Sequence, residues 1–311
     1  MHFYTRRGVV RAVDGVDMTI GAKSIVGLVG ESGSGKSTLG FAIMRLLPPQ
    51  GKIVQGAMLF QRQDLARLTE REMRQIRGKK ISMVFQDPLS FLNPVMKVGD
   101  QIVEAVVSAE GSGPQDAEQK ASELLERLGI PRSRDILNDY PHQLSGGMRQ
   151  RVLMAIATVS NPSLFIADEP TTALDVTVQA QILEEIKNLA RNIDSSVLLI
   201  THDLGIVAET CHEVVVMYAG KMAEYAGAEV LFETPLHPYT AALLDSALSI
   251  DKFKKELIGV PGDVPNLISP PTGCRFHPRC PQAMPRCCEE EPRPFEVGAG
   301  HKVCCWLYER D

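Results

Sequence analysis

The segment from Ile25 to Leu47 constrains the fold more than any other part of this chain. A short apolar run, Ile25–Val29, leads directly into Gly30-Glu31-Ser32-Gly33-Ser34-Gly35-Lys36-Ser37, which fits the pattern G-x-x-x-x-G-K-[ST]. The residues that follow, Lys36–Leu47, have the pattern of a helix. Small residues in such a loop let backbone N–H groups curl around phosphate oxygens, and the lysine adds a point charge. The segment therefore predicts a strand, a phosphate-binding loop and a helix.

Apolar runs alternate with helical patterns along much of the remaining chain, which predicts βαβ units around a parallel sheet. Four further runs are short and nearly continuous, as expected for strands covered on both faces. They are Ile81–Phe85, Leu164–Ala167, Val197–Thr201 and Val214–Met217. Helices are predicted at Val98–Val107, Asp116–Leu128, Met148–Val159 and Val178–Arg191. The first two of these helices lie between Gln86 and Leu144 and predict a helical subdomain inserted into the sheet domain.

Length and charge exclude some classes of protein. The 311 residues suffice for one large domain and an appendage. A net charge of −5 gives no support for nucleic acid as a main partner. No apolar run approaches the roughly 18 residues of a membrane span, and residues 1–20 lack the apolar stretch of a signal peptide. Any membrane contact is expected to go through other proteins.

A second glycine-rich motif, Leu144-Ser145-Gly146-Gly147-Met148-Arg149-Gln150, opens a predicted helix. Its backbone donors and the helix dipole are suited to face an anion. A nucleotide held by the phosphate loop of one subunit and by this motif of another would be sandwiched in a dimer. The alternative is structural: a helix-capping serine followed by a flexible turn.

Two acidic residues, Asp168 and Glu169, end the predicted strand Leu164–Ala167. A carboxylate at the tip of a strand beside a phosphate loop is suited to hold Mg²⁺ through water. A second carboxylate directly after it is placed to act as a general base on an attacking water. The alternative is a pair of solvated acids at the end of a strand.

The phosphate loop followed by Leu-Ser-Gly-Gly resembles the ATP-binding-cassette (ABC) ATPases. The longer string Tyr140-Pro141-His142-Gln143-Leu144-Ser145-Gly146-Gly147-Met148-Arg149-Gln150-Arg151 is similar to the ATPase subunits of dipeptide and oligopeptide importers. The resemblance covers about Phe3 to Asp311. It implies an α/β fold with an ABC-type P-loop NTPase core in residues 1–230, whose helical subdomain spans about 87–160. A small irregular cysteine-rich C-terminal domain is then expected in residues 231–311.

The resemblance also assigns catalytic roles. Lys36 and His202 are expected to stabilise phosphate charge, and Glu169 to activate water. Mg²⁺ is expected on Ser37, Gln86 and Asp168, with Gln86 linking the core to the helical insert. Ser145, Gly146 and Gly147 are expected to reach the nucleotide of the opposite subunit, and Asp175, in Ala173-Leu174-Asp175, to cross the dimer interface. The remaining ATP-binding residues are Phe3, Tyr4, Gly30, Glu31, Ser32, Gly33, Ser34, Gly35 and Thr38.

The adenine ring needs an aromatic platform, because its flat face stacks well. Phe3 is the better match to the family, with Tyr4 as the alternative. Here the chain departs from the pattern, because related chains have another strand before this aromatic residue. The sequence leaves open whether the start is truncated or that strand is absent.

Six of the seven cysteines occur from Cys274 onward. Nine of the 20 prolines lie between Pro261 and Pro294, and they exclude a regular helix or central strand from that stretch. The spacing of the cysteines leaves an iron–sulfur cluster, zinc and free thiols open. The string Gly273-Cys274-Arg275-Phe276-His277-Pro278-Arg279-Cys280-Pro281 resembles the cluster-binding tail of some peptide-importer ATPases. That resemblance selects four ligands for a [4Fe–4S] cluster, Cys274, Cys280, Cys287 and Cys305, and leaves Cys288 and Cys304 as neighbours. His237-Pro238-Tyr239-Thr240 resembles the start of the same C-terminal region.

The function implied by the resemblance is ATP hydrolysis that drives an importer, with di- or oligopeptides as cargo. Its partners would be two transmembrane permease subunits, a second ABC ATPase in a hetero- or homodimer and, indirectly, an extracytoplasmic substrate-binding protein. The chain would lie peripherally on the cytoplasmic face of the cell membrane. Nickel or oligosaccharide import remains an alternative, as do a non-transport ABC ATPase in translation or repair and a regulatory module without turnover.

Overall fold

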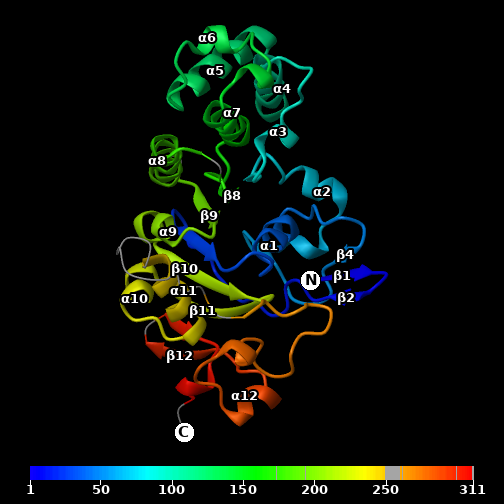
Figure 1. The fold of residues 1–311 in the computed structure, drawn as a ribbon. Coiled ribbons are helices and arrows are strands. Elements are labelled where there is room, and N and C mark those ends of the chain that lie inside the picture. The colour runs from blue at the N-terminus through cyan, green and yellow to red at the C-terminus, as the bar shows by residue number, and fades with distance from the viewer. Residues whose placement is uncertain (173, 193, 249–259, 261, 299, 310–311) are drawn as a thin grey trace. The chain divides into compact units, whose positions relative to one another are not determined.

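A computed structural model describes residues 1–172, 174–192, 194–248, 260, 262–298 and 300–309 (Figure 1). The chain divides into two compact units. The first comprises residues 1–20, 24–67 and 199–311, and the second comprises residues 21–23 and 68–198. The predicted division into residues 1–230 and 231–311 follows sequence motifs rather than compactness, and it stays a prediction.

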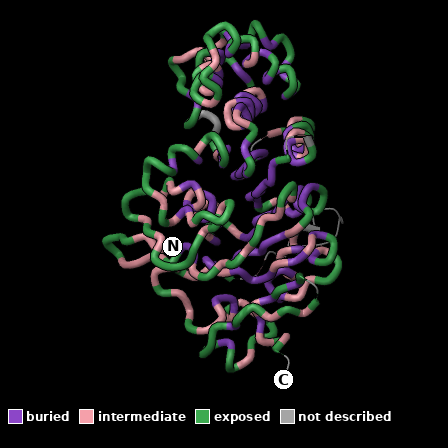
Figure 2. The backbone as a smooth tube through the Cα atoms, turned by 180° about the vertical axis from the view of Figure 1, so that it is seen from behind, coloured by how far each residue is buried: buried purple, intermediate pink, exposed green. Residues whose placement is uncertain are grey.

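The first unit is built on β3 (Ile25–Val29) and β10 (Glu213–Tyr218), which pair in parallel. Every residue of β3 is buried, and β10 is buried from its second residue onward (Figure 2). The strands predicted at Ile25–Val29 and Val214–Met217 are therefore confirmed. They form because continuous runs of β-branched and other apolar residues are stable where both faces of a sheet are covered.

The C-terminal segment extends this sheet, which the sequence analysis did not predict. β10 pairs with β11 (Lys221–Gly227), β11 with β13 (His301–Val303), and β13 with β12 (Phe295–Gly298), all antiparallel. Residues 273–309, called the tail below, are therefore joined to the strands of the first unit by backbone hydrogen bonds. Among its described residues, the proline-rich stretch also contains two short helices, the 3-10 helix η3 (His277–Arg279) and α12 (Pro285–Glu289), because proline is tolerated in a first helical turn.

A buried carboxylate links three segments of the same region by hydrogen bonds. Glu224 on β11 is fully buried and accepts hydrogen bonds from the backbone N–H groups of Leu236 (2.8 Å) and His237 (2.9 Å). Its Oε1 atom also lies 2.7 Å from Nε2 of His301 on β13. A buried carboxylate is tolerated only when such donors surround it. Glu224 thus ties β11, β13 and the chain before α11 (Pro238–Leu248) together.

Helix α1 (Lys36–Ile43) follows the phosphate loop but ends four residues earlier than predicted. Arg45 adopts a left-handed backbone conformation with φ of 50°. Its N–H bonds the carbonyl of Ala42 (3.0 Å), while the N–H of Leu46 bonds the carbonyl of Phe41 (2.8 Å). This is a Schellman motif with arginine at the position that glycine usually occupies, so the sequence carried no stop signal.

The described residues of the first unit also form two small antiparallel sheets and further short helices. One sheet has the order β2 (Gly8–Val10), β1 (His2–Thr5), β4 (Gly51–Lys52), and the other pairs β5 (Leu59–Phe60) with β6 (Gln63–Asp64). The helices are α9 (Leu204–Thr210), α10 (Ala228–Glu233) and the one-turn η1 (Leu65–Arg67) and η4 (Trp306–Tyr308).

The second unit contains β7 (Ile81–Val84) and β8 (Leu164–Asp168), which pair in parallel with Ile81 opposite Leu164. The chain returns to the first unit within β9 (Ser196–Ile200), which is buried throughout. These strands confirm three of the predicted runs to within one residue at each end. Each run was predicted to be a buried strand because its apolar residues are nearly continuous.

The predicted helices of the second unit are confirmed with small shifts at their ends. α4 (Val98–Glu110) runs past Val107 to a left-handed glycine, Gly111, and α5 (Pro114–Arg127) begins on its proline. α4, α5 and α7 (Gly146–Thr158) pack against one another. The other helices among the described residues are α2 (Glu70–Arg74), α3 (Pro88–Phe91), α6 (Ser133–Ile136), the one-turn η2 (Pro141–Gln143) and α8 (Val176–Asn192). Within the described ranges, no helix has the length and apolar content to cross a membrane.

Candidate nucleotide-binding site

The phosphate loop joins β3 to α1, and its glycines have a steric reason to be glycine. Gly30 and Gly35 have φ of 147° and 102°, which side chains rarely allow. A Cβ on Gly30 would collide with the carbonyl oxygen of Met217, and one on Gly35 with that of Ala12. At these two glycines the backbone of the loop therefore packs directly against neighbouring backbone and leaves no room for a side chain.

The side chain of Lys36 lies inside this loop. The residue is 6% exposed, and its Nζ donates to the carbonyl oxygens of Gly30 (2.7 Å) and Glu31 (3.0 Å). Lys36 also begins α1, whose N-terminal N–H groups and dipole favour an anion. The loop thus encloses a buried ammonium group at the start of a helix, and these donors fit the phosphates of a nucleoside triphosphate. The binding roles of Gly30 to Thr38 stay predictions.

Gln86 and Glu169 were predicted separately, and the second unit brings them together. The Nε2 atom of Gln86 donates to Oε2 of Glu169 at 2.9 Å, and the hydroxyl of Thr172 donates to the same oxygen at 2.9 Å. Sequence reasoning missed Thr172, although it lies three residues after Glu169 in a tight turn. The two donors fix the orientation of the carboxylate.

Glu169 has an unusual backbone. Its φ is 47°, a left-handed conformation that is uncommon for a residue other than glycine. Asp168 precedes it as the last residue of β8 and is 3% exposed. Strained residues of this kind cluster at functional sites, where neighbouring contacts hold them in place. The strain agrees with a chemical role for Glu169, whereas an exposed structural acid would not need it.

The Leu-Ser-Gly-Gly motif begins α7 within the second unit. Ser145 is the N-cap, and its hydroxyl accepts a hydrogen bond from the N–H of Met148 (3.3 Å). A Cβ on Gly147 would collide with the side chain of Val178 on α8, whereas Gly146 has more room. The structural alternative thus explains Ser145 and Gly147 within this chain, and their contact with a second subunit stays a prediction.

Asp175 and His202 lie at the starts of helices in different units. The carboxylate of Asp175 accepts from the N–H of Val178 (3.0 Å) at the start of α8, and Ala173 lies outside the described residues. His202 is exposed in the first unit, after β9 and next to Asp203, which caps α9. Both roles stay predictions.

Two aromatic residues on β1 were candidates for the adenine platform. The ring of Phe3 lies against Gly51 on the neighbouring strand, where even a Cβ would be 2.9 Å from it. Tyr4 is 48% exposed, and Nζ of Lys52 lies 5.5 Å from its ring centre. Tyr4 therefore has an exposed ring with Lys52 beside it, whereas the family pattern favours Phe3, and the adenine platform stays a prediction.

The four cysteines selected from the resemblance lie around one small cavity in the first unit: Cys274, Cys280, Cys287 and Cys305. Cys288 is exposed, and Cys304 lines a different cavity. Burial raises the pKa of Cys274 to about 11, and the neighbouring thiols of Cys287, Cys305 and Cys280 add to the rise. The pKa of Cys305 is also raised to about 11, mainly by burial. All four are free cysteines.

A metal site is not found at these cysteines. Among the described residues, no group of three or more His, Cys, Asp or Glu side chains is disposed to hold a metal ion. The shared cavity supports the choice of cysteines, but the [4Fe–4S] cluster and the cysteine-rich domain are not confirmed.

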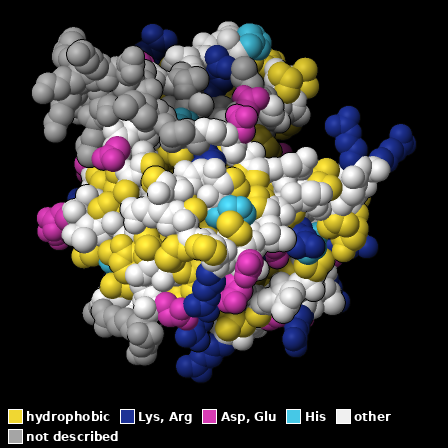
Figure 3. Space-filling view, turned by 60° about the horizontal axis from the view of Figure 1, so that its bottom comes forward, with side chains coloured by type: hydrophobic (Ala, Val, Ile, Leu, Met, Phe, Trp, Pro, Cys, Tyr) yellow, Lys and Arg dark blue, Asp and Glu magenta, His cyan; other side chains and the backbone are white. Residues whose placement is uncertain are grey.

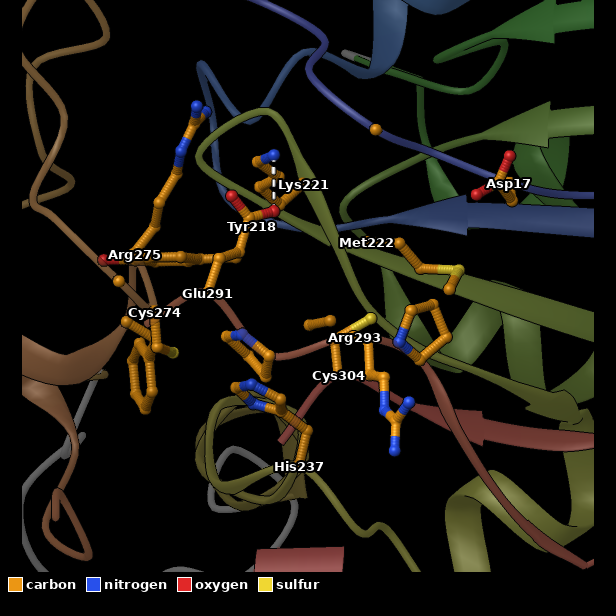
Figure 4. Close-up of a pocket in the computed structure, with 16 residues that line it drawn as sticks. Asp17, Tyr218, Lys221, Met222, His237, Cys274, Arg275, Glu291, Arg293 and Cys304 are labelled. Atoms are coloured by element: carbon orange, nitrogen blue, oxygen red, sulfur yellow. Dashed lines mark ion pairs between the residues drawn. The ribbon is translucent and has the colours of Figure 1, made fainter. Parts of the chain in front are cut away.

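A second cavity of about 350 Å³ lies between the β10–β11 hairpin and the tail (Figure 4). Lys221 and Glu291 form an ion pair of 2.5 Å at its wall, drawn as a dashed line. Among the described residues that line it, none belongs to the predicted ATP-binding set. The phosphate loop and this cavity are therefore separate features.

Comparison with known proteins assigns the family. The profile "ABC transporter" matches residues 13–172, and the profile "Oligopeptide/dipeptide transporter, C-terminal region" matches residues 223–287. The oligopeptide transport ATP-binding protein AppD of Bacillus subtilis is 47% identical over 311 residues, covering 100% of this chain and 95% of that protein. The dipeptide transport ATP-binding protein DppD of Escherichia coli is 44% identical, covering 98% and 93%.

Solved structures agree with this assignment. The ATP-binding cassette MJ0796, in a dimeric post-hydrolysis state with ADP and Pi, matches with a TM-score of 0.66 and 26% identity. The match covers 73% of this chain and 95% of that one. Three observations thus support one family: the α/β P-loop core, the glycines that backbone packing requires, and the 47% sequence identity over the whole chain. The chain belongs to the ABC transporter ATPases and carries the C-terminal region of the oligopeptide and dipeptide transporters.

Proposed function

We propose that this chain is the ATP-hydrolysing subunit of an importer for di- or oligopeptides. The observation that carries the proposal is the joint presence of the Lys36 phosphate cradle and the Gln86–Glu169 contact in one chain. Its relatives are named for oligopeptide and dipeptide transport, and the similarity includes the C-terminal region. In this function, nucleotide-driven closure of an ATPase dimer would reshape the membrane subunits, and hydrolysis would reset them.

Each residue would contribute to hydrolysis through the atoms already described. Lys36 and His202 would neutralise phosphate oxygens, and Ser37, Gln86 and Asp168 would hold Mg²⁺. Mg²⁺, when bound, supplies positive charge beside the phosphates. The Glu169 carboxylate would accept a proton from the attacking water, while Gln86 and Thr172 keep its oxygen oriented. Tyr4 or Phe3 would stack on the adenine ring.

The proposed partners follow from the arrangement of the motifs. Ser145, Gly146, Gly147 and Asp175 lie at helix starts, where they would meet the nucleotide of a second ATPase chain. We expect that second chain to be a similar but distinct ATPase. Two permease subunits would bind the helical insert, on the cytoplasmic face of the membrane, with a binding protein acting on the opposite face.

Copurification from native membranes tests the assignment and its cargo. We expect a tagged chain to recover two polytopic membrane proteins and a second ABC ATPase. The binding protein of that complex should then bind peptides rather than nickel or oligosaccharides in a direct binding assay. Recovery of ribosomal or repair proteins alone would contradict the transport function, and a binding protein specific for nickel would contradict the peptide cargo.

We also propose that Cys274, Cys280, Cys287 and Cys305 hold a [4Fe–4S] cluster, whose role would be structural or regulatory. Their common cavity supports this, since four thiolates are the usual ligands of such a cluster. Anaerobically purified protein should contain about four iron and four sulfide per chain. Cys287→Ser should lose them, whereas Cys288→Ser, which changes the exposed neighbour, should keep them. Stoichiometric zinc or a metal-free parent would contradict the cluster.

A further inference from the structure

We propose that Arg279 and Tyr239 are positioning residues for the phosphate loop. Both belong to the C-terminal region, and both bind Glu31, the second residue of the loop. The inference rests on the proposed role of this loop in ATP binding. The positioning role assigns a function to two C-terminal motifs, His237–Thr240 and Gly273–Pro281. Neither motif contributes a residue to the proposed hydrolysis mechanism.

The side chain of Glu31 is held by a two-pronged ion pair. Nη1 of Arg279 donates to Oε2 of Glu31 at 2.7 Å, and Nη2 donates to Oε1 at 3.1 Å. The Arg279 side chain is 4% exposed and that of Glu31 is 26% exposed. Bidentate arginine–carboxylate pairs are among the stronger hydrogen-bonded contacts and fix orientation as well as distance. The hydrogen bonds to Glu31 also raise the pKa of Arg279.

The backbone of Glu31 is held by a second C-terminal residue. Its N–H donates to the hydroxyl of Tyr239 at 2.9 Å, and Tyr239 is fully buried on α11. The N–H of Glu31 is therefore directed at the C-terminal region, although the sequence analysis included Glu31 among the residues that bind ATP. Side chain and backbone of one loop residue are thus both fixed from outside the loop.

Glu31 passes this constraint to the groups that bind phosphate. Its carbonyl oxygen accepts from Nζ of Lys36 at 3.0 Å and from the N–H of Ser34 at 3.1 Å. A displacement of Glu31 would therefore shift an acceptor of the phosphate-binding lysine and open the turn between Glu31 and Ser34. Small displacements of this kind are costly where a bound group must be oriented closely.

The contacts of Arg279 and Tyr239 with Glu31 are supported by the same cluster of aromatic rings. Tyr218 lies 4.7 Å from Tyr239 and 5.1 Å from Phe276, measured between ring centres, and Tyr239 lies 5.4 Å from Phe276. Nη1 of Arg279 lies 3.2 Å from the Tyr218 hydroxyl, and its Nη2 donates to the carbonyl of Val260 at 2.7 Å. Figure 4 shows Tyr218, His237 and Cys274 around the neighbouring cavity. Phe276 and Arg279 both lie in the segment from Cys274 to Cys280, so the fold of that segment places Arg279 against the loop and Phe276 against the two tyrosine rings.

Nucleotide affinity measured on the purified full chain tests the proposal. Arg279→Gln and Tyr239→Phe should each raise the Kd for Mg-ATP about three- to tenfold, because a smaller fraction of the protein then has the competent loop. The kcat at saturating ATP should change less than KM does. Arg279→Lys should restore part of the affinity. Arg286→Gln is the matched control, since Arg286 is another tail arginine whose ion partners are Glu290 and Glu309.

A double-mutant cycle separates positioning from general stability. Arg279→Gln combined with Glu31→Gln should bind Mg-ATP no more weakly than Arg279→Gln alone, because both changes remove the same ion pair. The proposal is overturned if the variants lower the melting temperature but leave Kd and KM unchanged, or if the two changes simply add. Tyr239→Phe removes one oxygen and keeps the ring, so it provides the test if Arg279→Gln does not fold. If the parent binds ATP without hydrolysing it, the Kd comparison still decides the positioning role while the proposed hydrolytic function fails.

Discussion

Replacing Glu169 with glutamine is expected to lower the kcat for ATP hydrolysis by about 10²- to 10⁴-fold, the range typical of a lost acid–base group. The amide oxygen of glutamine can still accept the hydrogen bonds that Gln86 and Thr172 give to the carboxylate. The local structure should therefore persist. An amide cannot take a proton from water near neutral pH, so turnover should be lost while nucleotide binding remains.

Steady-state phosphate release and equilibrium ATP binding measure the two parts of this prediction. Glu184→Gln is a suitable control, because it makes the same chemical change at an exposed position on α8 in the same unit. That variant should keep both the kcat and the Kd of the parent. A Glu169→Gln variant with parental kcat would exclude Glu169 as the general base, and parallel losses of binding and turnover would indicate a damaged site.

The strands nearest the phosphate loop were the most predictable part of the fold. The run Ile25–Val29 coincides with β3, because a continuous apolar segment in front of a G-x-x-x-x-G-K-[ST] loop has one stable arrangement. The end of α1 was not predictable in the same way. There Arg45 takes the left-handed position of a Schellman motif, where glycine is the usual residue.

The tail was less predictable because its strands are short and lie among prolines and glycines. β12 and β13 have four and three residues, and neither pattern identifies a strand without its partner. Pairing with β11 supplies the missing stabilisation, and Glu224 adds a buried polar anchor. On the face shown in Figure 3, basic and acidic side chains lie near one another.

The candidate site illustrates the same limit. The individual residues of each motif could be predicted from the sequence, because each has a side chain suited to its expected role. The contact of Glu169 with Gln86 and Thr172 joins residues up to 83 positions apart, and the Arg279–Glu31 pair joins residues 248 apart. Periodicity and spacing report only local geometry, so contacts of this range need the folded chain.

Replacing Lys36 with methionine is expected to raise the Kd for ATP about 10- to 100-fold. This corresponds to losing one hydrogen bond from a charged donor, about 1.5–3 kcal/mol. Methionine keeps the length and most of the volume of the side chain but removes the charge and the donors to Gly30 and Glu31. Lys36→Arg should not restore binding, because the planar guanidinium does not fit a site where the residue is 6% exposed.

The melting temperature with and without Mg-ATP provides the measurement. Ligand at 100 times its Kd stabilises a folded protein by about 2.7 kcal/mol, so the parent should melt at a visibly higher temperature with ATP. At the same ATP concentration, Lys36→Met should lose about half of that rise if its Kd is tenfold higher and most of it if its Kd is a hundredfold higher. Lys23→Met is the control, because Nζ of Lys23 pairs with Asp194 and its side chain is 61% exposed. If Lys36→Met kept the full rise, the backbone of the loop alone would hold the triphosphate, and the charge of Lys36 would serve hydrolysis rather than binding.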